Sequence, residues 1–173
     1  FDTTIKKSSG GLVAAFEDIV TDKKFTWVGW AGTFPKNKEQ EVIISQKLKA
    51  FNYEPLFLSK SQIKTYYDGF CNASLWPLLH YFPSNYRHED HWFTTYKEVN
   101  EQFSDYICER APKNSFIWVQ DYHFFLLPAL IKKNRPDLKV GFFLHTPFPS
   151  YEIFRIHPNR TELLTGVLGA DGI

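Results

Sequence analysis

The chain has 173 residues, of which 43% are hydrophobic and 18% are aromatic. This composition is typical of a well-packed globular domain and excludes a disordered chain. Lys and Arg number 20 against 19 Asp and Glu, which gives a formal net charge of +1. Because there is no basic excess to neutralise a phosphate backbone, the charge gives no support for nucleic-acid binding.

The two cysteines, Cys71 and Cys108, form neither a disulfide framework nor a metal-binding spacing. We expect two free, buried thiols in the reducing cytoplasm. No apolar run approaches the ~18–20 residues of a membrane span, and no signal-peptide pattern opens the chain, so no membrane association is expected. The chain starts at Phe1 without Met and ends where a new strand begins. We therefore expect a fragment of a longer protein.

In the first part of the chain, the patterns predict two strands and two helical segments. Residues 9–11 read as a glycine turn that opens a helix, residues 24–30 and 53–58 as strands, and residues 62–79 as mainly helical with an interruption at Pro77. Five apolar residues then recur at steps of 4, 3, 4 and 3, namely Trp92, Tyr96, Val99, Phe103 and Tyr106. This spacing predicts a long helix with one face packed in the core.

The second part of the chain predicts a strand, a helix and a further strand joined by short links. Residues 116–119 form a continuous apolar run, as expected of a strand covered on both faces. A helix over 126–134 and a second buried strand over 139–144 follow, and then helices over 151–155 and 160–168. A βαβ crossover requires parallel strands. The predicted fold is an α/β, doubly wound, Rossmann-like domain with a parallel sheet.

Polar side chains stand at the ends of both predicted strands, where ligands bind in such sheets. Asp121 directly follows the first strand, and His145 ends the second, before a loop stiffened by Pro147 and Pro149. Asp121 could instead cap the next helix, and His145 could be structural. Two polar residues at neighbouring strand ends favour a site, and carboxylate and imidazole groups both suit sugar hydroxyls.

Two other patterns have weaker functional meaning. Gly10 and Gly11 before a helix could cradle a phosphate, although such a pair is more often only a turn. The run His88-Glu89-Asp90-His91 resembles a metal cluster, but it is expected to be a solvated loop without a helix to hold ligands. No metal site is predicted.

Several segments resemble trehalose-6-phosphate synthases, which form glycosyltransferase family 20. The resemblance is carried by WVQDYH (118–123), LLP (126–128) and GFFLHTPFPS (141–150), and by SGGL (9–12), GW (29–30), YY (66–67), NASLWP (72–77) and EIFR (152–155). These blocks occur in the family's order and cover nearly the whole chain. Gln120 departs from the family, many members of which have His at this position.

The resemblance implies that residues 1–173 are a single acceptor-side, N-terminal domain of a two-domain GT-B glycosyltransferase, with the C-terminal donor domain absent. Such enzymes transfer glucose from UDP-glucose to glucose 6-phosphate with retention, giving trehalose 6-phosphate and UDP, and need no metal or other cofactor. The resemblance also implies a cytoplasmic protein. It leaves open a homo-oligomer, a complex of the trehalose pathway and a following phosphatase domain.

Site residues carried over from the family fall into a donor side and an acceptor side. Gly10 and Gly11 would lie against the donor diphosphate, and His145 would contact the donor glucose beside the scissile bond. On the acceptor side, Tyr67 near the phosphate, Trp76, Trp30 and the hydroxyl-binding Asp121 would form the pocket. In the family's front-face mechanism the leaving phosphate takes the acceptor's proton, so Asp121 orients the acceptor and is not a nucleophile.

Two alternatives remain open from the sequence. One is a pseudo-glycosyltransferase on the same scaffold, which would act on a cyclitol and form a C–N bond. The other is a catalytically silent, synthase-like regulatory protein that binds sugar phosphates. In the family, the Arg near the amino terminus that helps hold the acceptor phosphate would lie upstream of Phe1, and the Arg/Lys pair that grips the donor diphosphate lies in the C-terminal half.

Overall fold

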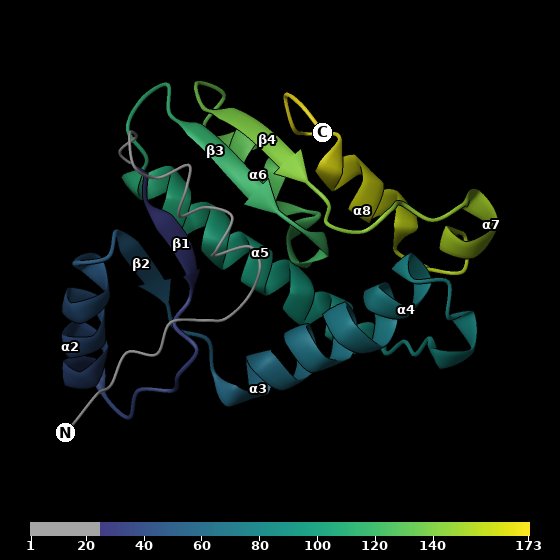
Figure 1. Ribbon diagram of the computed structural model, residues 1–173, viewed down its shortest axis with the longest axis horizontal. Coiled ribbons are helices and arrows are strands. Elements are labelled where there is room, and N and C mark those ends of the chain that lie inside the picture. Colours follow the sequence, from purple (N-terminus) through teal and green to yellow (C-terminus); the bar gives the residue numbers. More distant parts are fainter. Residues whose placement is uncertain (1–24) are drawn as a thin grey trace. The chain divides into compact units, whose positions relative to one another are not determined.

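A computed structural model describes residues 25–173 of the chain (Figure 1). The chain divides into two compact units, one ending at Leu58 and the other running from Ser59 to Ile173. The glycine turn and helix expected within residues 9–16 lie outside the described residues.

The described part of the first unit is a parallel strand pair connected through one helix. Strand β1 (Trp27–Trp30) pairs with β2 (Tyr53–Leu56), with Trp27 opposite Tyr53, so both predicted strands are confirmed. Helix α2 (Lys38–Lys49) was not predicted, because none of its side chains is buried within the described residues and no apolar face marks it. Two features of the sequence do indicate a helix here. The side chain of Asn37 caps its N-terminus by accepting from the Gln40 N–H, and the first turn carries acidic residues while the last turn carries basic ones.

The second unit begins with one continuous helical run. It consists of α3 (Lys60–Gln62), the π-helix η1 (Ile63–Leu75) and α4 (Trp76–Leu79), which confirms the predicted helical segment. Helical structure continues through Pro77, and the change of hydrogen-bonding register comes one residue earlier. Because Pro77 has no N–H to offer the carbonyl of Ala73, that carbonyl accepts from the Arg87 N–H at 2.9 Å.

The predicted long helix is α5 (Asp90–Arg110), which follows the short 3₁₀ turn η2 (Pro83–Asn85). Its buried face is close to the predicted one but rotated slightly. Trp92 and Tyr106 lie at the half-buried edge. The buried positions are Phe93, Tyr96, Val99, Asn100, Phe103, Ser104 and Ile107.

The predicted βαβ unit is present and parallel. Strand β3 (Phe116–Gln120) leads through the 3₁₀ turn η3 (Tyr122–Phe124) and α6 (Leu127–Asn134) to β4 (Lys139–Phe143). The two strands pair in register from Phe116 opposite Lys139 to Gln120 opposite Phe143. Helices α7 (Tyr151–Phe154) and α8 (Arg160–Val167) follow as predicted. The Phe142 N–H donates to the Gly172 carbonyl at 2.9 Å, and Gly172 forms an isolated parallel bridge with Gly141 of β4.

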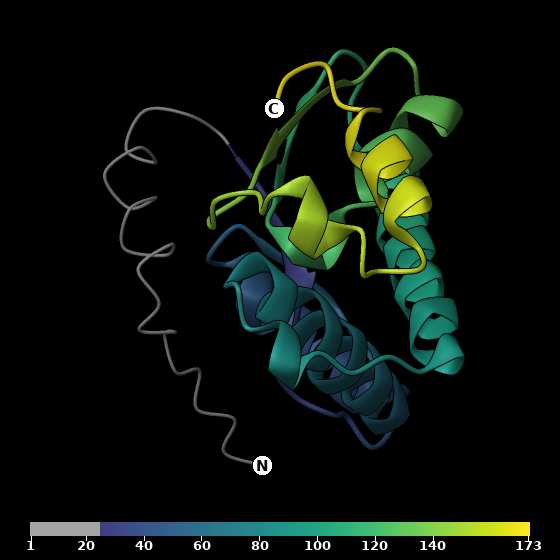
Figure 2. The ribbon, with the colours of Figure 1, turned by 90° about the vertical axis from the view of Figure 1, so that its right-hand side faces the viewer.

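The prediction that both strands are covered on both faces was wrong for the described residues. Figure 2 shows α6 and α8 on one side of the β3–β4 pair, where Val119, Val140 and Phe142 are buried. On the other face, Phe116 and Trp118 are 65% and 45% exposed, and Phe143 is 47% exposed. The apolar run alone could not distinguish a strand covered on one face from one covered on both.

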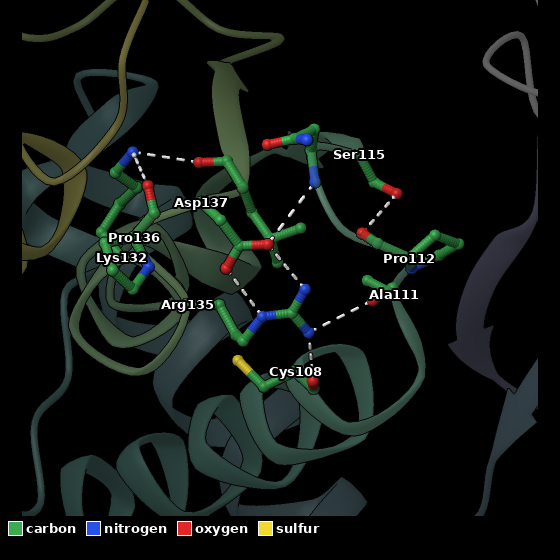
Figure 3. A network of polar contacts seen from close by, with 10 residues as sticks. Cys108, Ala111, Pro112, Ser115, Lys132, Arg135, Pro136 and Asp137 are labelled. Carbon is green, nitrogen blue, oxygen red and sulfur yellow. Dashed lines mark hydrogen bonds and ion pairs between the residues drawn. The ribbon is translucent and has the colours of Figure 1, made fainter.

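A polar network at the start of β4 ties the helices to the sheet (Figure 3). The Arg135 guanidinium donates to the carbonyls of Cys108 and Ala111 at the end of α5, at 2.6 and 3.2 Å, and forms two 2.8 Å hydrogen bonds with Asp137. This guanidinium lowers the pKa of Asp137 to about 2. Both cysteines are free thiols as expected, but only Cys71 is fully buried, while Cys108 is half-buried beside Arg135.

Candidate functional site

Asp121 and His145 lie together at the carboxyl edge of the β3–β4 pair. The Asp121 N–H donates to the Phe143 carbonyl at 2.7 Å, which continues the strand pairing by one residue. Asp121 Oδ1 accepts from the His145 N–H at 3.4 Å, and His145 Nε2 lies 2.9 Å from Gln120 Oε1. Within the described residues, the Asp121 side chain does not cap the helical turn that follows it. The geometry therefore favours a strand-end site over a helix cap.

The backbone of Asp121 adopts a conformation that non-glycine residues rarely have, with φ 67° and ψ 174°. This region is essentially reserved for glycine, and occupying it costs on the order of 1–3 kcal/mol. Such a residue persists only where its surroundings fix it, and strained residues of this kind concentrate at functional sites.

Three buried polar side chains hold the turn that follows Asp121. The Tyr96 hydroxyl donates to the Tyr122 carbonyl and accepts from the Phe125 N–H, both at 2.8 Å. The His123 carbonyl accepts from the Tyr66 hydroxyl at 3.1 Å and from Asn100 Nδ2 at 3.2 Å. Burial raises the pKa of both Tyr66 and Tyr96, so the hydroxyls stay protonated and able to donate. These residues, from η1 and α5, were not predicted as part of the site.

Tyr67 lies in the π-helix η1, and Trp76 is the first residue of α4. They are nine residues apart, and each is partly exposed, at 40% and 38%.

Tyr67 is connected to the Asp121 turn through stacked rings. Its ring stacks on His123 with centroids 5.4 Å apart, and His123 stacks in turn on Tyr122 at 4.3 Å. The Tyr122 hydroxyl donates to Asn72 Oδ1 of η1 at 3.2 Å. Burial lowers the pKa of His123 to about 4, although the nearby Asp121 charge acts in the opposite direction. The imidazole between the two tyrosine rings is therefore neutral at pH 7.

Trp76 lies farther along the helical run, at the start of α4. Its ring stacks on His80 at 4.1 Å and lies nearly parallel to Phe82 at 6.2 Å. The neighbouring Tyr81 hydroxyl accepts from the Ser150 N–H at 2.8 Å. This bond ties the end of α4 to the loop that follows His145, so one unit carries Tyr67, Trp76, Asp121 and His145.

The described structure does not place the three remaining predicted site residues relative to this site. Trp30 belongs to the first unit, where its ring packs on Phe34 at 5.7 Å. Gly10 and Gly11 lie outside the described residues. The roles of these three residues stay predictions.

The segment around His88 is in part the solvated loop that was expected, because Glu89, Asp90 and His91 are exposed. Asp90 and His91 begin helix α5, and the His88 side chain is only 18% exposed, packed against Tyr86 and His157. Among residues 25–173, no group of three or more His, Cys, Asp and Glu side chains is placed to hold a metal ion. Of the helices in the same range, none is long and apolar enough to cross a membrane.

A parallel βαβ unit with polar side chains at both strand ends is typical of Rossmann-like ligand-binding domains. Comparison with known proteins is specific about the family. The sequence model of glycosyltransferase family 20 matches residues 1–173, and the chain belongs to this family. The expected α/β, Rossmann-like fold class is confirmed by solved trehalose-phosphate synthases of the same fold.

Three similar proteins illustrate the relationship. An alpha,alpha-trehalose-phosphate synthase (UDP-forming) of Dictyostelium discoideum is 44% identical over 94% of this chain and 22% of its own length. A trehalose-6-phosphate synthase structure, from work on glycosyl transfer with retention, has a TM-score of 0.80 and 26% identity, covering 96% of this chain and 37% of its own. The N-terminal domain of Candida albicans trehalose-6-phosphate phosphatase has a TM-score of 0.81 and 26% identity, covering 99% and 37%. The chain thus spans well under half the length of these proteins.

Proposed function

We propose that this chain is the acceptor-side part of a UDP-glucose-dependent, retaining glycosyltransferase that forms trehalose 6-phosphate and UDP from glucose 6-phosphate. The observation that carries the proposal is the pairing of Asp121 with His145 at the strand ends of a family 20 chain. The UDP-forming activity in the name of the Dictyostelium relative supports the choice of donor.

Each side chain has a role that its chemistry allows. The Asp121 carboxylate accepts hydrogen bonds from acceptor-sugar hydroxyls, and the Tyr67 hydroxyl donates to the acceptor phosphate. Trp76 offers a partly exposed aromatic surface to the sugar, and His145 contacts the donor glucose. The resemblance to family 20 assigns Gly10 and Gly11 to the donor diphosphate and Trp30 to the acceptor pocket, and these roles stay predictions.

The proposed reaction is a front-face displacement. The acceptor hydroxyl attacks the anomeric carbon, the bond to the UDP phosphate oxygen breaks, and that leaving phosphate takes the hydroxyl proton. The chain supplies no nucleophile and no proton in this scheme. Its contribution is positioning, for which the fixed turn at Asp121 is suited because its geometry is set before substrate binds.

The test is UDP release by the full-length protein supplied with UDP-glucose and glucose 6-phosphate. Asp121→Asn keeps the shape of the side chain but removes its charge, and a hydrogen bond to a charged group contributes about 1.5–3 kcal/mol. We expect kcat/KM for the acceptor to fall roughly 10- to 150-fold, since ~1.4 kcal/mol is a factor of ten. Tyr67→Phe should raise KM for glucose 6-phosphate, whereas Tyr151→Phe, at a residue 69% exposed on α7, should not.

Absence of UDP release from the full-length protein would refute the proposed activity. The isolated 173-residue chain should not turn over, because it spans well under half the length of the synthases it matches and lacks half of the donor site. We further propose a cytoplasmic location, which the two free thiols support.

The second candidate is a regulatory sugar-phosphate-binding protein. It is favoured by one observation, the similarity to the N-terminal domain of a phosphatase. Binding of glucose 6-phosphate by the full-length protein without UDP release would support this candidate. Direct binding assays with UDP-glucose would also separate both candidates from a pseudo-glycosyltransferase with a different donor.

A further inference from the structure

Gln120 is the last residue of β3 and contacts the imidazole of His145. Its Oε1 lies 2.9 Å from His145 Nε2, which is the usual distance of an N–H···O hydrogen bond. The Phe143 ring and the same imidazole pack in an edge-on arrangement, with centroids 4.9 Å apart and planes at 71°. His145 is otherwise exposed, and within residues 25–173 Gln120 is the side chain that anchors its ring by a hydrogen bond.

This contact determines which nitrogen of the imidazole carries hydrogen. An amide oxygen has no hydrogen to donate, and a neutral imidazole has one donor and one acceptor nitrogen. With the Gln120 amide oriented in this way, the hydrogen belongs on Nε2 and Nδ1 is left as an acceptor. The His145 main chain is held separately, because its N–H donates to Asp121 Oδ1 at 3.4 Å. Within residues 25–173, Asp121 is the charged group in hydrogen-bond contact with His145.

We propose that Gln120 is a positioning residue, which fixes His145 as the Nε2–H tautomer and presents Nδ1 as the acceptor for a hydroxyl of the donor sugar. The tautomer is a property of the chain alone. Only the sugar-hydroxyl part rests on the proposed function. With the opposite orientation of the Gln120 amide, the amide would donate to Nε2 and the hydrogen would reside on Nδ1. A measurement of the His145 tautomer therefore distinguishes the two orientations.

The first experiment is long-range ¹H–¹⁵N NMR of the histidine side chains in the ¹⁵N-labelled 173-residue chain at pH 8. We expect His145 to show a protonated Nε2 and an unprotonated Nδ1. In Gln120→Leu the two nitrogen shifts should converge, because both tautomers become populated. Gln120→Glu keeps an acceptor oxygen in place and should retain the Nε2–H form. Gln102→Leu, at an exposed position of α5, is the control and should leave His145 unchanged.

An Nδ1–H tautomer in the native chain, or unchanged shifts in Gln120→Leu with folded amide spectra, would overturn the proposal. The second experiment measures UDP release by the full-length enzyme. Loss of one hydrogen bond, about 1 kcal/mol, should lower kcat roughly fivefold in Gln120→Leu. KM for glucose 6-phosphate should change less than kcat, and Gln120→Glu should restore most of the rate. A confirmed tautomer without any UDP release would refute the proposed function and leave the positioning role standing.

Discussion

The strained backbone of Asp121 can be tested by comparing Asp121→Gly with Asp121→Ala. Both variants lose the carboxylate and its 3.4 Å contact with the His145 N–H, so the difference between them reports the backbone alone. Alanine at φ 67° and ψ 174° keeps the strain of about 1–3 kcal/mol, and glycine relieves it. Against this gain, glycine makes the unfolded chain more flexible, which costs about 0.4–1 kcal/mol.

At the midpoints of these ranges, Asp121→Gly should be more stable than Asp121→Ala by about 1.3 kcal/mol. For a chain of this size the difference corresponds to a Tm higher by roughly 3–5 °C. The assay is urea unfolding followed by tryptophan fluorescence, with the slope of the transition compared between variants.

Asp105 provides the matched control, because it is exposed within helix α5 and has ordinary helical geometry. There Gly should be less stable than Ala by about 1 kcal/mol. The two positions are thus expected to show opposite signs. If Asp121→Gly is less stable than Asp121→Ala by the margin found at Asp105, no strain is stored at Asp121 and the reasoning fails.

Three further predictions concern the rest of the second unit. Tyr96→Phe removes the hydroxyl that donates to the Tyr122 carbonyl and accepts from the Phe125 N–H. Because two buried groups lose their partner, the free energy of unfolding measured by urea titration should fall by about 2–3 kcal/mol. The hydrogen bonds to Arg135 lower the pKa of Asp137 to about 2. The ionised carboxylate therefore stabilises the folded chain above the unfolded pKa of ~4, and this contribution is lost as pH falls from ~4 to ~2. In Asp137→Asn, the free energy of unfolding should depend less on pH in this range. Cys108 is half-buried, whereas Cys71 is fully buried and its pKa is raised by burial. In the native chain, Cys108 should therefore react with a thiol reagent at least ~10-fold faster than Cys71. Equal rates would contradict the packing.

The sequence predicted the strands, most helices and the meeting of Asp121 with His145, because these depend on local periodicity and on the rule that parallel strands end together. It failed where the outcome depends on distant partners. Tyr66 and Tyr96 contact the turn across separations of 57 and 26 residues, and no pattern identifies such a pair. The π-register of η1 likewise depends on packing, since its residues are compatible with an ordinary helix. Helix α2 was missed for a different reason. Its capping signals are present in the sequence, but it lacks the apolar face from which the other helices were predicted.

Two features of the second unit cost free energy, namely the π-helical register of η1 and the strained backbone of Asp121. Both lie beside the turn that follows Asp121, and this argues for a common cause. A π-helix forms poorer hydrogen bonds than an α-helix and is found frequently at functional sites. Here the π-helix carries Tyr67, whose ring reaches the Asp121 turn through His123. Both features border the turn that follows Asp121, one through the Tyr67–His123 stacking and the other through the backbone of Asp121 itself. Both are explained if the unit is shaped to hold these side chains in fixed positions before a ligand binds, which is the condition under which positioning would accelerate the transfer proposed above.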